Sequence, residues 1–473
     1  MQALMVKLDN ESKIPMYMQL YEEIKGQILD GQLGPDEKLP SLRNLSDFLK
    51  ISITTVEQAY AQLLVEGYVY SSPHRGYFVS NISPVQKDQE QGFVSLGEFD
   101  SSRLTDDKIE YDVNCFDFTK WKKYTNKVFN LYPHLLMSPS DPQGEEFLRH
   151  EISKYIYTAR GVKCVPEQIV IAAGTQQITG HIARILHILG IRNIALEEPC
   201  YLPVNNIFRD RGFAISRIPV KKDGICIERL PSNIQSAVYV NPSNQFPTGA
   251  VMPVGKRYKL LEWAKENDSY IIEDDYNSEL RYFGKPVVSL KGMDTLDRVI
   301  YLGSFSATLF PSVKISYMVL PKKMAEIFKG IRKDYSQTCS KTEQLALAFY
   351  MADGKFQTGI KKIRKLYSQK LSMTINAFSK FGRDMVKPIN MDSGINVIIK
   401  VKSKKTVENL SRQAKEVGLL ITSTEEYSNP PNWQNDPDEK MMIFYYTRVP
   451  IEKIELLVEK LIDIWKKEDT SER

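Results

Sequence analysis

The chain has 473 residues, of which 42% are hydrophobic and 26% are charged, and its formal net charge is +5. The composition is that of a globular protein, the length exceeds what one hydrophobic core normally organises, and the small net charge identifies no partner. No secretory signal is visible in the charged first residues, and no apolar run is long enough to span a bilayer, so we expect a cytoplasmic protein with at least two domains.

Five cysteines and five histidines are scattered along the chain. They lack the paired spacing of a zinc site or of a disulfide framework. We therefore expect reduced thiols in packed positions and no metal.

The first 80 residues predict three helices and a hairpin. Residues 15–30 have apolar side chains at helical spacing, a second short helix is expected after Pro40-Ser41, and a third is expected to open at Ser52 or Thr54. Thr54 and Glu57 have the spacing of a capping box. Two short strands, 68–70 and 77–79, flank a polar turn, and this order predicts a winged helix-turn-helix.

This segment resembles the GntR family of bacterial repressors. The resemblance runs through residues 12–80 and rests on Lys38-Leu39-Pro40-Ser41, Glu66-Gly67-Tyr68 and Arg75-Gly76-Tyr77-Phe78-Val79. It implies that operator DNA is contacted by Ser41, Arg43, Thr54 and Thr55, with Arg75 and Gly76 of the wing as further candidates. A purely structural alternative for Thr54 is a helix cap. Residues 1–80 carry seven Lys or Arg and ten Asp or Glu, so the DNA-binding prediction rests on local geometry and not on bulk charge.

Residues 81–111 are polar and contain few apolar side chains to bury, which predicts a flexible linker. From residue 112 to 473, short apolar runs alternate with helical patterns. Apolar runs at 168–172, 193–196, 237–240, 270–272 and 299–302 predict a mostly parallel sheet covered by helices, which is an α/β domain. Ligands of such sheets bind at the carboxyl ends of the strands.

Chemically capable residues follow each of these predicted strands. Gly174-Thr175-Gln176 forms a glycine turn that opens a helix and suits a phosphate. The residues after the other strands could contact a flat aromatic ring, its nitrogen and its hydroxyl group, and they are Tyr201, Asn244, Gln245, Asp274 and Tyr276. Each of them alone is explained equally well as a turn, core or surface residue.

Taken together they resemble the fold-type I aminotransferases, and the fusion behind a GntR head resembles the MocR subfamily of regulators. The resemblance implies that pyridoxal 5′-phosphate (PLP) is the cofactor, with Asp274 on the pyridine nitrogen and Tyr276 on the ring hydroxyl. The phosphate would be held by Thr175, Gln176, Ser304, Ser306 and Lys314, where Lys314 replaces the usual arginine.

Two departures from that family bear on function. In the run from Ser304 to Pro311, Ala307 stands where the Schiff-base lysine is expected, so imine formation and transamination are not expected. Either the chain was altered at this position, which the intact neighbouring residues favour, or it is a natural regulator that holds PLP noncovalently. Pro203 and Ile443 stand where arginines for a substrate carboxylate are expected, although Arg448 could serve, so PLP itself becomes a candidate effector alongside amino compounds.

The sequence thus predicts a PLP-binding, ligand-responsive transcriptional regulator that binds operator DNA as a head-to-tail homodimer on repeated half-sites. The first alternative is an aminotransferase with an accessory DNA-binding head, inactivated at Ala307. The second is a regulator whose body no longer binds PLP and serves only for dimerisation.

Overall fold

The computed structural model describes residues 8, 9, 12, 14–82, 111–282, 288–389, 394–428 and 439–467. The chain divides into two compact units, Met1–Ser101 and Ser102–Arg473. The predicted linker, residues 81–111, lies almost wholly outside the described residues. The predicted boundaries at residues 80 and 112 therefore stay predictions.

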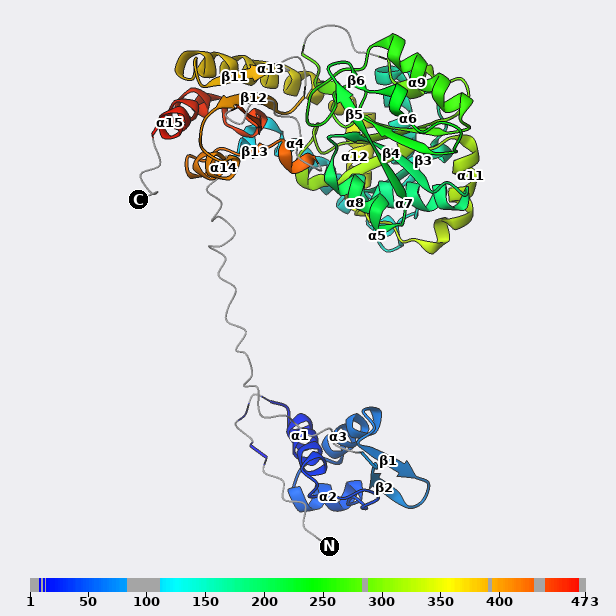
Figure 1. The fold of residues 1–473 in the computed structure, drawn as a ribbon. Coiled ribbons are helices and arrows are strands. Elements are labelled where there is room, and N and C mark those ends of the chain that lie inside the picture. The colour runs from blue at the N-terminus through cyan, green and yellow to red at the C-terminus, as the bar shows by residue number, and fades with distance from the viewer. Residues whose placement is uncertain are drawn as a thin grey trace. The chain divides into compact units, whose positions relative to one another are not determined.

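The first unit, here called the head, is the predicted set of three helices and a hairpin (Figure 1). Its elements are α1 (Met16–Leu29), α2 (Leu42–Leu49), α3 (Ile53–Val65), β1 (Val69–Ser72) and β2 (Gly76–Val79). The apolar faces of the three helices pack together in one core, which includes Leu20, Ile24, Leu45, Val56 and Leu63, all at most 1% exposed. A hydrogen bond from the Tyr60 hydroxyl to the carbonyl of Pro40 ties α3 to the segment before α2 at 3.0 Å.

The second unit, here called the body, contains an eight-stranded sheet in the order β3-β10-β9-β8-β7-β4-β5-β6. The strands are β3 (Ile169–Ala173), β4 (Asn193–Glu198), β5 (Ala214–Lys221), β6 (Gly224–Ile225), β7 (Ala237–Val240), β8 (Tyr270–Asp274), β9 (Val299–Ser304) and β10 (Ile315–Val319). All five predicted strands are present. The sheet is parallel from β9 through β5, while β10 runs antiparallel between β3 and β9.

Helices cover both faces of this sheet because its strands are apolar on both sides (Figure 1). In β3, Ile169 and Ile171 pack with α4 (Phe118–Leu131), α6 (Glu146–Arg160) and α12 (Lys341–Ala352), whereas Val170 and Ala172 pack on the other side. That other side is covered by α7 (Gly174–Ile188), α8 (Leu202–Asp210) and α11 (Lys322–Ile331). A further buried cluster contains side chains of α9 (Val254–Glu266) and of α10 (Leu290–Met293). The short helix α5 (Pro133–Leu136) follows α4 in the chain.

The end of the body forms a smaller layer. An antiparallel sheet in the order β11-β12-β14-β13 consists of β11 (Val386–Ile389), β12 (Val397–Lys402), β13 (Ile421–Ser423) and β14 (Glu439–Phe444). It shares a core with α13 (Lys355–Phe381), α14 (Val407–Glu416) and α15 (Ile454–Lys466). Ala307 packs against this core at its edge, so the loop after β9 lies where the two layers of the body meet.

Among the described residues, no helix is long and apolar enough to cross a membrane. The five cysteines are all unpaired.

Candidate functional site

The predicted cofactor-binding residues of the body lie at one edge of the large sheet. Strands β3, β4, β7, β8 and β9 run in the same direction, so their carboxyl ends share that edge, and β10 begins there. The order and direction of the strands within the sheet therefore bring the predicted site residues together, although these residues are far apart in the sequence.

One end of the site has the form of an anion cradle. The register pairs Ile315 with Ala173 and Ser316 with Ser304, so the start of α7, the end of β9 and Lys314 lie on adjacent strands. Gly174 opens α7 with φ +83°, and the aliphatic stem of Lys314 lies 4.0 Å from the point where a Cβ on Gly174 would be. The free amides of the first turn and the Lys314 ammonium suit a phosphate.

Serine hydroxyls complete this cradle. The Ser304 hydroxyl accepts a hydrogen bond from the Ser306 amide at 3.3 Å and lies 3.1 Å from the Ser316 hydroxyl. The hydroxyl of Thr338 accepts a hydrogen bond from the Ala173 amide at 2.9 Å and so fixes the turn before Gly174. Ser316 and Thr338 were not predicted, because their place depends on strand pairing and on a distant loop.

Asp274, the last residue of β8, is buried and only 7% exposed. The Tyr239 hydroxyl donates to it at 2.6 Å, and the Asn241 side chain donates to the Asp274 carbonyl at 3.0 Å. Burial raises the pKa of Asp274 to about 6 despite these hydrogen bonds. A buried carboxylate of this kind is stabilised by a cationic partner such as a protonated ring nitrogen.

The neighbouring Asp275 has a structural role. Its carboxylate accepts from Arg160 at 2.6 Å and from the Tyr301 hydroxyl at 2.7 Å, and all three side chains are buried. This network ties α6 to strands β8 and β9 and fixes the backbone that carries Asp274. No sequence motif indicates this network, since the three residues are far apart along the chain.

Aromatic side chains gather near Asp274, and this cluster of Phe246, Tyr201, Tyr276 and Tyr427 is here called the aromatic wall. The ring of Phe246 contacts those of Tyr201, Tyr276 and Tyr427 edge to face, at centroid distances of 6.1, 6.5 and 4.8 Å. Burial raises the pKa of Tyr201, and the charges of Asp274 and of Tyr445 act in the same direction. Tyr201 and Tyr276 therefore lie close to Asp274, as a ring-stacking residue and a hydroxyl partner require, while Phe246, Tyr427 and Tyr445 were missed.

The structure corrects the prediction for Gln245. Its side chain donates to the carbonyls of Pro199 and Phe246 at 2.8 and 2.7 Å, and it accepts from the Thr248 amide and hydroxyl at 3.2 and 2.6 Å. These bonds use both of its amide hydrogens to shape the loop of the ligand-free protein, which leaves none of them free for the predicted contact to the cofactor. Asn244 is buried and donates to Asn277 at 3.3 Å, which leaves it beside Tyr276 as a candidate.

The positions expected to bind a substrate carboxylate hold no cation. Pro203 lies in the first turn of α8, and Ile443 is fully buried in β14 opposite Ile398 and Thr422. The guanidinium of Arg448 lies 5.2 Å from the ring centre of Tyr445, so it is near the aromatic wall. Arg448, which was predicted as the alternative cation, is therefore placed beside these aromatic side chains.

In the head, helix α3, which was predicted to contact DNA, begins with a different cap from the predicted one. Ser52 caps α3 by accepting from the Thr55 amide at 3.1 Å, and the hydroxyls of Ser52 and Thr55 are 2.8 Å apart. The predicted capping box of Thr54 and Glu57 is therefore wrong, and so is the alternative that Thr54 is a cap. Thr54 is exposed on the first turn of α3.

The other predicted DNA-binding residues are also accessible. Ser41 caps α2 by accepting from the Asn44 amide at 3.3 Å, and Arg43 is exposed on the first turn of that helix. In the wing, Arg75 lies 5.6 Å from the Phe78 ring centre, and Gly76 has φ +109°, which favours glycine. Exposed hydroxyls, guanidinium groups and helix amino ends fit contacts to a DNA backbone.

Comparisons with known proteins agree with both parts. The family described as "Bacterial regulatory proteins, gntR family" matches residues 16–79, and the family "Aminotransferase class I and II" matches residues 108–433. The HTH-type transcriptional regulator YdeL of Bacillus subtilis is 35% identical, with 97% of this chain and 98% of the relative covered. The probable rhizopine catabolism regulatory protein MocR of Rhizobium meliloti is 30% identical, with 90% of each covered.

The chain belongs to the MocR subfamily of GntR-type transcriptional regulators. Its body has the fold-type I aminotransferase fold. LysN, an α-aminoadipate aminotransferase of Thermus thermophilus solved with N-(5′-phosphopyridoxyl)-L-leucine, superposes with a TM-score of 0.65. That match has 21% sequence identity and covers 78% of this chain and 95% of LysN, so it establishes the fold of this MocR-type body.

Proposed function

We propose that this MocR-type chain binds PLP noncovalently in its body and uses ligand binding there to change how its heads bind operator DNA. The observation that carries the proposal is the buried Asp274 at the same sheet edge as the phosphate cradle and the aromatic wall. These groups suit the ring nitrogen, the phosphate and the ring of PLP. The methyl group of Ala307 cannot form the covalent link.

Each residue has a defined task in the proposal. Asp274, held by Tyr239, keeps the ring nitrogen protonated, and Tyr276 hydrogen-bonds the ring hydroxyl. Gly174, Thr175, Gln176, Ser304, Ser306 and Lys314 hold the phosphate, and Tyr201 covers the ring. When bound, PLP supplies a reactive aldehyde to which an amino compound can add.

Catalysis is not part of the proposed role. Efficient transamination needs a protein amine at position 307 to exchange with the substrate and to carry the proton, and a methyl group does neither. The intact surroundings of Ala307 nevertheless favour one second candidate, an aminotransferase inactivated at this single position. Steady turnover of amino donors by an Ala307→Lys variant would support that candidate, whereas stoichiometric reaction without turnover would support the sensor.

The same variant tests the PLP site itself. We expect wild type to bind PLP without forming a covalent imine, and Ala307→Lys to develop the visible absorption band of PLP joined to a lysine. An Ala325→Lys variant on α11 serves as the control for adventitious lysine reaction. No PLP binding to either wild type or Ala307→Lys, by absorbance and by equilibrium dialysis, would remove PLP from the account.

Three further features belong to the proposal. We propose that the chain acts in the cytoplasm, where operator DNA is accessible to it. We propose that it forms a head-to-tail homodimer, because two heads then contact repeated half-sites. The proposed effector is PLP or an amino compound that reacts with it, and the absence of arginine at positions 203 and 443 argues against an ordinary α-amino acid.

A further inference from the structure

Two helices of the body are strongly basic and contain no acidic residue. Helix α4 carries four lysines, and α13 carries seven Lys or Arg residues. We call the exposed lysines at the start of these two helices the basic face, and they are Lys120, Lys122, Lys123, Lys355, Lys361, Lys362 and Lys365.

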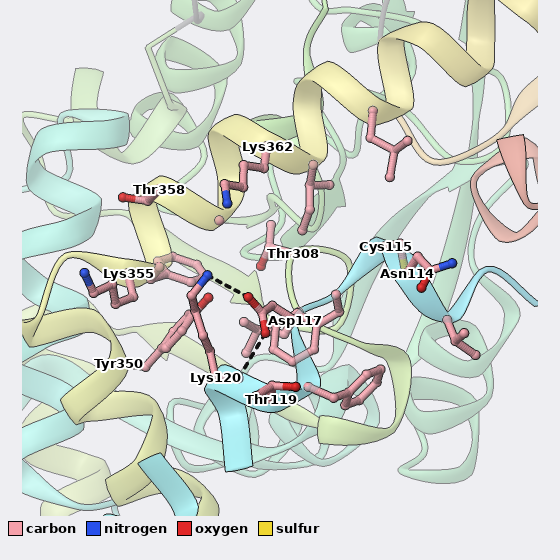
Figure 2. Close-up of a pocket in the computed structure, with 18 residues that line it drawn as sticks. Asn114, Cys115, Asp117, Thr119, Lys120, Thr308, Tyr350, Lys355, Thr358 and Lys362 are labelled. Carbon is pink, nitrogen blue, oxygen red and sulfur yellow. Dashed lines mark hydrogen bonds and ion pairs between the residues drawn. The ribbon is translucent and has the colours of Figure 1, made fainter. Parts of the chain in front are cut away.

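Three hollows border the two helices. A cavity of about 580 Å³ lies between α4 and α13. Figure 2 shows its lining side chains, which include Lys120 from α4 and Lys355 and Lys362 from α13. A second hollow, of about 680 Å³, shares Thr119 with the first and continues along α4 past Lys122 and Lys123. A third, of about 300 Å³, lies farther along α13 beside Lys361 and Lys365.

Little of this positive charge is neutralised within the body. Asp117 pairs with Lys120 at 2.6 Å, Asp112 pairs with the buried Lys370 at 2.6 Å, and Asp353 accepts a hydrogen bond from Tyr124. In the described parts of the chain, the other six lysines of the basic face make no ion pair. Lys380 does pair with Glu455, but near the far end of α13.

A cluster of lysines without acidic partners is unfavourable for the protein alone, because like charges repel. Lys361 and Lys365 are one turn apart, and like charges at that spacing destabilise a helix. From Lys355 to Lys365 the helix rises about 15 Å, along which a DNA duplex presents several phosphates. An extended polyanion is the partner that relieves this repulsion along the whole face.

On α13 the other exposed groups favour nucleic acid over a membrane. The exposed residues of α13 from Lys355 to Lys365 are all polar, and the second hollow contributes Asn126 and Asn130, while α4 also exposes Phe118, Phe129 and Leu131. Amide and hydroxyl donors between lysines fit phosphate and sugar oxygens, whereas a membrane-binding helix face presents large apolar side chains. The charge division points the same way, because residues 1–80 carry −3 and the rest of the chain carries +8.

We propose that the basic face of the body binds the phosphate backbone of DNA without sequence preference, in addition to the contacts made by the heads. This inference rests on the proposed role in DNA binding. It assigns the sequence-independent part of the affinity to the body and the reading of sequence to the heads.

The test uses the full-length chain and a mixed-sequence 60-base-pair duplex, with affinity measured over a range of salt concentrations. The face variant combines Lys122→Gln, Lys123→Gln, Lys361→Gln and Lys365→Gln. The control variant removes four exposed lysines from α9 and α11, through Lys259→Gln, Lys265→Gln, Lys323→Gln and Lys329→Gln. We expect the face variant alone to lose roughly 2 to 4 units of the slope of log K against log salt, and at least about tenfold in affinity at low salt.

The possible outcomes are distinct. If wild type binds the duplex and the face variant keeps the slope of the control variant, the inference is wrong and the role of the heads stands. If wild type binds no duplex, the proposed role in DNA binding fails and the inference fails with it. If the face variant alone becomes monomeric in sedimentation, or wild type binds anionic phosphatidylserine vesicles through this face and not DNA, the face has another partner and the inference is wrong.

Discussion

At the scale of single residues, the site contains carboxylates that are buried in the ligand-free protein. Glu197, at the carboxyl end of β4, is 2% exposed; one of its oxygens accepts from the Asn241 amide at 3.1 Å, and the other has no hydrogen-bond partner among the described residues. Burial raises the pKa of Glu197 to about 8 and that of Asp274 to about 6. At pH 7 Glu197 is therefore mainly neutral in the ligand-free protein, whereas Asp274 is mainly ionised.

The raised pKa of Glu197 predicts a pH-dependent stability. Between pH 4.5 and about 8 the folded chain keeps a proton that the unfolded chain has lost, so the free energy of unfolding falls as pH rises through this range. Glu197→Gln imitates the protonated form. We expect it to match wild type at pH 5 and to exceed it by about 2 to 4 kcal/mol at pH 9.

Urea unfolding at the two pH values measures this difference. Glu228→Gln is the control, because Glu228 is exposed. An advantage for Glu197→Gln that is equal at pH 5 and pH 9 would mean that packing, and not ionisation, is responsible.

At the scale of elements, the start of α3 separates a structural role from a recognition role. Ser52 and Thr55 are joined at the amino end of the helix, while Thr54, between them, is exposed and takes no part in the cap. Hydroxyl residues next to each other in the sequence therefore have different tasks. The strongest contrast is between Ser52 and Thr54.

This contrast predicts opposite effects of two alanine substitutions. Ser52→Ala removes the cap and should lower the stability of the head by about 1 kcal/mol. Thr54→Ala should leave stability unchanged and weaken binding to a duplex selected by the wild-type protein from a random pool by roughly 1 to 2 kcal/mol. Thermal unfolding and fluorescence anisotropy measure the two quantities, and weaker DNA binding without loss of stability in Ser52→Ala would contradict this division.

At the scale of the whole molecule, the body has to influence the head if the chain is a sensor. The site lies where the large sheet meets the smaller layer, because Ala307, after β9, packs against the core of the smaller layer. Near this junction the hydroxyls of Tyr282 and Tyr446 both donate to the carbonyl of Gly394, at 2.6 and 2.8 Å. A ligand at this junction contacts both layers. It can therefore stabilise one arrangement of the body over another.

Loss of the Asp274 carboxylate tests this coupling. We expect PLP to change the affinity of the wild-type chain for the selected duplex, and Asp274→Asn to weaken PLP binding by about 10- to 100-fold because the charged partner of the ring nitrogen is lost. The response of DNA binding should then require correspondingly more PLP. Asp223→Asn, at an exposed ion pair with Lys256, is the matched control.

A body that only dimerises makes a different prediction. In that case Asp274→Asn and wild type bind DNA equally at every PLP concentration, and sedimentation gives the same dimer for both. This result would leave the head as the functional part of the chain and the aminotransferase fold as a scaffold.

Much of this molecule was determined by local sequence. The helices and hairpin of the head, the five predicted strands, and the placing of Asp274, Tyr276 and Ser304 at the carboxyl ends of strands all follow from apolar periodicity and turn residues, which act over a few positions. The families followed from the same motifs, and the matches to both family descriptions confirm them.

Only the tertiary structure decided how side chains share their hydrogen bonds. Gln245 was predicted to bind the cofactor, but Pro199, Phe246 and Thr248 use its amide; Ser52 and not Thr54 caps α3; and Asp275 is held by Arg160 and Tyr301. These pairings and the basic face shared by α4 and α13 join residues that are distant along the chain or depend on the exact helix start. A local pattern specifies which segments form helices and strands, but the packing of those segments decides which polar groups remain free to bind a ligand.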